Sequence, residues 1–209
     1  MAIDDDVLFR LPALALAEIS AEVRDGDILL CAAHDPFSRL IGWSTKSPWS
    51  HVALAYRWAA LDRIVAFECV QQIGVHAVSL ERFISQTSSG AKPYPGKIVL
   101  ARHGGLAGRM KDAEAKVIRR MTDFAVDRMG DRFSPFEVLK IATRIAVGRF
   151  NRHMPRMLGA KDEYICSEYV AKCFQRIGIQ IAWDGLGFIA PADIARDPQV
   201  TAVARFRTR

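Results

Sequence analysis

Two residues have side chains suited to nucleophilic catalysis, Cys166 and His51. Cys166 stands at or just before the first turn of a predicted helix, SEYVAKCFQRI, which ends at Gly178. A cysteine there meets the positive end of the helix dipole and unpaired backbone N–H groups, and both favour the thiolate. His51 opens an apolar strand, and an imidazole beside a thiolate completes a nucleophilic pair. From spacing alone a second interpretation stays open, in which Cys166 is a small core residue and His51 a structural one.

Glu68 is a candidate third member of this site. In the predicted strand RIVAFECV, the face that carries Glu68 is otherwise apolar, because it also carries Ile64, Ala66 and Val70. A carboxylate on such a face is unfavourable unless a group pairs with it, and an imidazole from the neighbouring strand is a natural partner. Alternatively the strand end reaches solvent and Glu68 is merely exposed. In that case Gln71, Gln72 or His76 would orient His51.

Aromatic residues near these positions are candidates for binding the substrate. Trp49 precedes His51 and Tyr164 precedes Cys166, so both are expected to line the cleft, although aromatic residues beside a loop pack in the core just as often. The chain has five histidines and four cysteines, but none of them shows metal-ligand spacing. No phosphate-binding glycine loop and no G-x-S-x-G motif is present. We therefore expect neither a metal nor a cofactor.

The elements that must position these residues predict an α+β fold. Short apolar runs indicate strands in the first half, and apolar residues at three- and four-residue spacing indicate helices in the second. The segments 50–58 and 63–70 are close enough to form an antiparallel pair. Residues 34–49 are expected to be a loop, and residues 179–209 a loop with short pieces of structure. The expected helices are 7–23, 80–85, one that begins after 105, one that begins near 134, and 167–177; the expected strands are 28–33, 50–58, 63–70, 74–78 and 97–102.

Length and composition fit one domain over residues 1–209, with an N-terminal helical extension over 1–24 and a basic helical segment over 106–160. The net charge is +6, and residues 102–156 contain 13 Lys and Arg against 6 Asp and Glu. A solvated helix face explains this excess, and no nucleic-acid-binding motif accompanies it. An apolar stripe beside Lys140, Arg144, Arg149 and Arg152 would also suit peripheral contact with an anionic membrane.

Several short strings, in this order, resemble a known family: GDILL, STKSPWSHVAL, FECV, MGDRF, YICSEYVAKCFQRIGI and PADIARDP. From about Gly26 to about Pro198 the chain resembles the circularly permuted NlpC-type papain-like cysteine hydrolases, which share their architecture with lecithin:retinol acyltransferase-like enzymes. The resemblance implies a papain-like core, in which a small antiparallel sheet or barrel packs on the helix that carries the nucleophile. It also implies that the histidine strand precedes the cysteine helix. It makes Cys166 the nucleophile, His51 the general base and Glu68 the third polar residue.

One position departs from the family's pattern. A Tyr-Asp pair often follows the glycine that ends the helix before the nucleophile segment, and here that place reads Phe133-Ser134. The change removes a hydroxyl and a carboxylate, so substrate choice is expected to differ if that pair shapes the pocket.

The resulting prediction is a thiol hydrolase that cleaves an amide or peptide bond through a Cys-His acyl-enzyme. The alternatives are a lipid acyl hydrolase or acyltransferase at a membrane surface, and a catalytically inactive binding module. The expected partner is a small peptide or acyl-lipid substrate, and the oligomeric state is not indicated. No run is long and apolar enough to cross a bilayer, and Asp4, Asp5 and Asp6 stand where a signal peptide would be basic, so a cytoplasmic location is expected.

Overall fold

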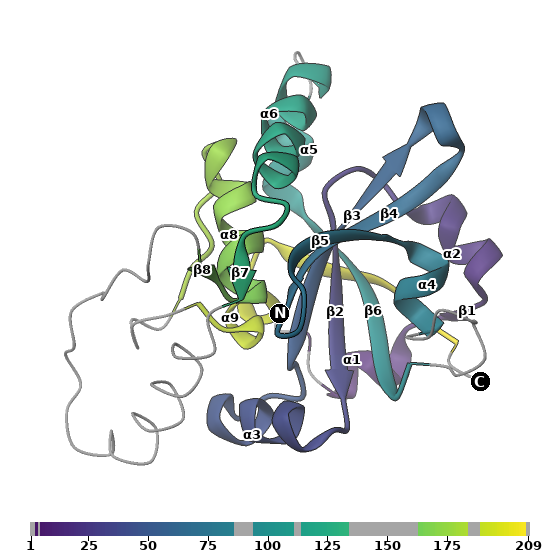
Figure 1. The fold of residues 1–209 in the computed structure, drawn as a ribbon. Coiled ribbons are helices and arrows are strands. Elements are labelled where there is room, and N and C mark those ends of the chain that lie inside the picture. Colours follow the sequence, from purple (N-terminus) through teal and green to yellow (C-terminus); the bar gives the residue numbers. More distant parts are fainter. Residues whose placement is uncertain are drawn as a thin grey trace.

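A seven-stranded sheet lies at the centre of the computed structural model (Figure 1), which describes residues 3, 5–85, 94–110, 114–133, 163–183 and 189–207. The strand order is β1-β9-β6-β2-β3-β4-β5, and every neighbouring pair is antiparallel except β1 and β9. Two further short strands form a separate parallel pair. The strands are β1 (Ala13–Leu14), β2 (Asp27–Ala33), β3 (His51–Trp58), β4 (Arg63–Val70), β5 (Gly74–Ser79), β6 (Gly96–His103), β7 (Arg132–Phe133), β8 (Glu163–Tyr164) and β9 (Val200–Phe206).

Helices cover both faces of the sheet. α8 and α6 pack on one face, and α2 and α4 contribute to the apolar cluster on the other. The helices are α1 (Asp5–Arg10), α2 (Leu16–Glu22), α3 (Pro36–Thr45), α4 (Leu80–Ser85), α5 (Gly104–Met110), α6 (Glu114–Asp127), α8 (Cys166–Arg176) and α9 (Pro191–Arg196), with a 3-10 turn, η1, at Ala59–Leu61. The α+β class expected from the sequence is therefore confirmed.

The central strand β2 shows why the sheet needs cover on both faces. Its residues are almost all buried, and successive side chains point to opposite faces of a strand. Ile28 and Leu30 enter the cluster beneath α8, whereas Leu29 and Cys31 enter the cluster beneath α2 and α4. A strand that is apolar on both sides can only be stable between two layers.

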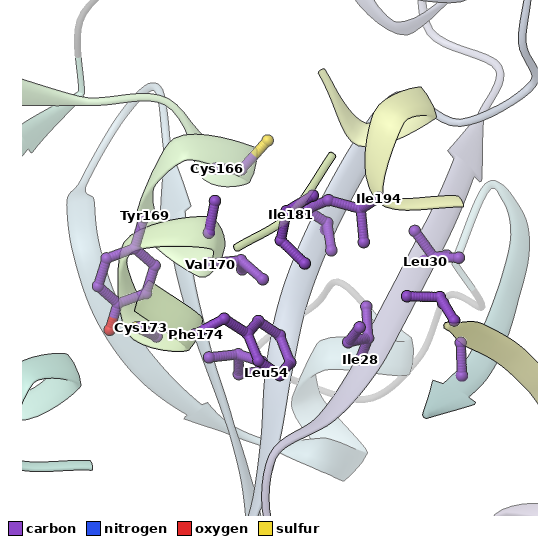
Figure 2. Packing of buried hydrophobic residues seen from close by; sticks show 14 of the residues in the cluster. Ile28, Leu30, Leu54, Cys166, Tyr169, Val170, Cys173, Phe174, Ile181 and Ile194 are labelled. Atoms are coloured by element: carbon purple, nitrogen blue, oxygen red, sulfur yellow. The ribbon is translucent and has the colours of Figure 1, made fainter. Parts of the chain in front are cut away.

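Helix α8 packs its apolar side on the sheet (Figure 2). Val170 and Phe174 lie against residues of β2 and β3 such as Ile28 and Leu54. Cys166 lies at the N-terminal end of this helix, and its sulfur points away from those apolar side chains. The packing of α8 thus fixes where the Cys166 sulfur emerges, beside the first residues of β3.

Several expected elements differ from the structure. The helix expected over 7–23 is interrupted, because Pro12 lacks an N–H, and β1 joins the sheet between α1 and α2. The loop expected over 34–49 contains α3, whose start is fixed by Asp35 accepting a hydrogen bond from the Ser38 N–H at 3.0 Å. The C-terminal residues supply β9, which pairs with β6.

The structure confirms the strands expected in the first half and the helices at 80–85 and 167–177 within a residue or two. It also confirms the antiparallel pairing of β3 with β4. The single helix expected after residue 105 is instead described as α5 and α6. The helix expected near 134 lies outside the described residues, as do the basic residues Lys140, Arg144, Arg149 and Arg152. None of the described helices is long and apolar enough to span a bilayer.

Candidate active site

Cys166 is the first residue of α8 and is 8% exposed. The backbone N–H groups of Val52 and Ser167 donate to its sulfur, and His51 lies within hydrogen-bonding reach. Burial alone would raise the pKa of this thiol, but the positive charge of His51 and the three hydrogen bonds outweigh burial and lower it. The site therefore favours a thiolate at Cys166.

His51 begins β3, directly across from Cys31 on β2. Its Nε2 atom lies 2.7 Å from Oε2 of Glu68, which leaves Nδ1 as the nitrogen for Cys166. Phe83 stacks on the imidazole, with 6.3 Å between the ring centroids. Burial would lower the pKa of His51, but the charges and hydrogen bonds of Cys166 and Glu68 raise it to about 10. The lowered pKa of the Cys166 thiol and the raised pKa of His51 together favour the thiolate–imidazolium form of the pair over the neutral form.

Glu68 lies on β4, and both of its carboxylate oxygens are engaged. Oε2 contacts His51, and Oε1 lies 3.2 Å from Nε2 of His76 on β5. Burial would raise the pKa of this carboxyl, but the hydrogen bonds and charges of the two histidines lower it to about 2. Glu68 is 8% exposed, so the alternative of a solvent-exposed residue at a strand end does not hold.

These residues border a cavity of about 930 Å³. Its walls come from α3, the turn between β4 and β5, α4 and the first turn of α8. Cys166, His51 and Glu68 all lie in this wall, so a substrate that enters the cavity meets the nucleophile. The volume is in the range of ordinary small-molecule sites.

The two aromatic residues expected to bind substrate lie elsewhere. Trp49 is completely buried, and its Nε1 donates to the Ile3 carbonyl at 2.6 Å. Tyr164 is 4% exposed, packs edge-on against Tyr169 and lies beneath the Lys172 ammonium. Neither residue lines the cavity. Both predictions were wrong because closeness in sequence to His51 and Cys166 does not fix the direction of a side chain.

The cavity is also lined by residues that the sequence analysis did not identify. Phe83 covers the His51 ring, and Ser38 and Ile41 belong to α3, which was expected to be a loop. Asp35 directly before α3 and Pro36 at its first position form a helix-start signal that could have revealed them. Phe133 also lines the cavity, so the first residue of the Phe133-Ser134 departure borders the site.

The remaining cysteines differ from Cys166 in their surroundings. Cys31, Cys69 and Cys173 are all almost completely buried. The pKa of each of these three thiols is raised, and burial is the largest cause of the increase. Only Cys166 combines a lowered pKa with access to the cavity.

Comparisons with known proteins show a shared fold. No family model matches the chain, and no curated protein matches it. Among solved structures, the chain is similar to the crystal structure of the DUF1105 metalloprotein yiiX from Escherichia coli O157:H7. The match has a TM-score of 0.59 and 18% identity, and it covers 87% of this chain and 96% of that one. The two chains share a fold. Within the ranges that the structure describes, no group of three or more His, Cys, Asp or Glu residues is arranged to hold a metal ion.

Proposed function

We propose that this protein is a thiol hydrolase of the permuted papain-like type, which cleaves an amide or peptide bond. The observation that carries the proposal is the row Cys166–His51–Glu68 in the wall of one cavity. A thiolate needs an adjacent base, and the base needs a third group to orient it. The chain order, with His51 and Glu68 before Cys166, agrees with a permuted arrangement.

The first half of the reaction forms an acyl-enzyme. The Cys166 thiolate attacks the substrate carbonyl carbon, and the carbonyl electrons move onto oxygen. The first turn of a helix directs backbone N–H groups toward its N-terminal end, and those of α8 are the donors that we assign to that oxyanion. As the carbonyl re-forms, the bond to the leaving nitrogen breaks, and the His51 imidazolium gives its proton to that nitrogen. The amine leaves, and the acyl group stays on Cys166 as a thioester.

The second half releases the acid. Neutral His51 takes a proton from water, and the resulting hydroxide attacks the thioester carbonyl. The thiolate of Cys166 leaves, and His51 is again an imidazolium. Glu68 stays ionised throughout, holds the His51 ring through Nε2 and stabilises its positive charge.

A lipid acyl hydrolase or acyltransferase is the second candidate. Helix α3 borders the cavity and exposes two large apolar side chains, Leu40 (41% exposed) and Trp43 (70% exposed). An exposed apolar pair on a helix that borders the cavity suits contact with a lipid surface. A binding module without activity is the remaining alternative.

Intact-mass spectrometry with two electrophilic probes tests the proposal. One probe is a peptide vinyl sulfone, and the other is a fatty-acyl chloromethyl ketone. We expect a single adduct on the wild type and on Cys173→Ala, and no adduct on Cys166→Ala. Preference for the peptide probe supports the amidase, and preference for the acyl probe supports the lipid hydrolase. An unlabelled wild type, or equal labelling of Cys166→Ala, would leave the binding module as the better description.

A further inference from the structure

His76 is the direct cross-strand neighbour of Glu68, in the register that pairs β4 with β5. Its Nε2 atom lies 3.2 Å from Glu68 Oε1, and its Nδ1 atom lies 3.2 Å from the carbonyl oxygen of Gly74. Both ring nitrogens of His76 therefore face an oxygen atom.

These two contacts fix the protonation of the ring. An ionised carboxylate and a backbone carbonyl can only accept hydrogen bonds. Both nitrogens of His76 must therefore carry hydrogen, and the ring is an imidazolium whenever both bonds are made. The hydrogen bonds that His76 donates to Glu68 and to the Gly74 carbonyl accordingly raise its pKa above the ordinary value, although burial acts against them.

The Gly74 carbonyl is itself held in place. Gly74 has a φ of +83°, and a Cβ atom at this position would collide with the Asp131 backbone carbonyl. The Val75 N–H donates to that same Asp131 oxygen at 2.8 Å, and the Gly130 N–H donates to the Val75 carbonyl at 2.9 Å. The backbone that anchors His76 is thus pinned to the turn before β7.

The charges alternate along this row of side chains. In the ionised form that the site favours, the order is Cys166 thiolate, His51 imidazolium, Glu68 carboxylate and His76 imidazolium. The last torsion of a glutamate is broad when nothing restrains it. With His76 on Oε1, the carboxylate is held at both oxygens, and Oε2 stays directed at His51.

We propose that His76 is a positioning residue, which holds the second oxygen of Glu68 and thereby keeps His51 aligned with Cys166. This inference rests on the proposed function, because it concerns the same nucleophilic pair. It extends the site from three residues to four across β3, β4, β5 and α8.

Two neutral variants separate this role from a simple charge effect. Glutamine can place its amide N–H where Nε2 stands, so His76→Gln keeps the donor to Glu68 and loses the donor to Gly74. Asparagine places its amide near Nδ1, so His76→Asn keeps the donor to Gly74 and loses the donor to Glu68. Both variants remove the positive charge, so any effect of charge alone is equal in the two.

The readout is the alkylation rate of Cys166 by iodoacetamide across a pH range, which requires no substrate. We expect His76→Asn to react about three- to tenfold more slowly than the wild type at pH 6, with a smaller difference at pH 10. His76→Gln should stay within about twofold of the wild type, because one donor hydrogen bond is restored. Equal rates in the two variants, or a slower His76→Gln, would overturn the inference.

A second measurement needs no variant and covers the case in which either one fails to fold. ¹⁵N NMR of the wild-type histidine rings at pH 6 should show both nitrogens of His76 protonated. A neutral His76 ring would overturn the inference. The proposed function fails separately, if wild-type Cys166 reacts no faster at pH 6 than the other three cysteines.

Discussion

The Nε2 atom of His51 lies 2.7 Å from Oε2 of Glu68, across the neighbouring strands β3 and β4. This short contact assigns the two ring nitrogens of His51 to different partners, with Nε2 on the carboxylate and Nδ1 on the Cys166 side. It also accounts for a buried carboxylate, because burial without such partners would be strongly unfavourable. The relationship links the sheet to the end of α8, where the sulfur emerges.

Cys166 should be the most reactive of the four cysteines at pH 7. Its pKa is lowered mainly by the charge and hydrogen bond of His51 against the effect of burial, whereas burial raises the pKa of Cys31, Cys69 and Cys173. Peptide mapping after brief iodoacetamide treatment measures this. Cys166→Ala is the control and should lose the fast label. Faster labelling of any other cysteine in the folded protein would contradict the site.

Turnover should follow a bell-shaped pH profile that declines only at a high pH, near the His51 pKa of about 10. The thiolate exists above the lowered pKa of Cys166, and the imidazolium persists until the pH reaches the His51 pKa of about 10. Above that value the thiolate remains, but His51 has no proton to give the leaving nitrogen, so turnover declines. Initial rates from pH 4 to 11 test this. A limb near pH 6.5 would mean that His51 titrates as an unpaired histidine.

Glu68→Gln should lower turnover about tenfold to a hundredfold and leave the protein folded. Glutamine keeps the shape and an acceptor oxygen, but it removes the charge that stabilises the His51 imidazolium. Turnover and thermal unfolding of the variant provide the measurement, with the exposed Glu81→Gln on α4 as the matched control. Cys166→Ala should abolish turnover completely. Unchanged turnover for Glu68→Gln would transfer the orienting role to Gln71, Gln72, His76 or a backbone carbonyl.

Trp49→Phe should destabilise the fold and leave the chemistry intact. The smaller ring leaves the buried Ile3 carbonyl without the indole N–H, which costs about 1–3 kcal/mol in the free energy of unfolding. Chemical denaturation measures the loss. Trp43→Phe is the control, because a side chain that is 70% exposed should change stability by no more than about 0.5 kcal/mol. A fall in turnover at unchanged stability would instead return Trp49 to the substrate cleft.

The sequence by itself determined most of the local structure. Apolar runs bounded by turn residues identify β2 to β6, and the spacing of apolar residues in SEYVAKCFQRI places Cys166 at the start of α8. The expectation that Glu68 needs a partner also follows from its strand alone, because side chains alternate between the faces of a strand. These features depend on residues that are close together in the chain, so the sequence alone is enough to predict them.

Only the tertiary structure decided which side chains meet. Trp49 and Tyr164 stand next to His51 and Cys166 in sequence, yet both turn into packed surroundings away from the cavity. His76 meets Glu68 because the register of β4 and β5 sets the two directly across from each other, and α3 forms part of the cavity wall although a loop was expected there. A shift of one residue in register would move His76 to the other face of the sheet. The packing of α8 and the strand register therefore bring together Cys166 and the His51–Glu68–His76 row, because contacts between distant segments depend on how the elements pack.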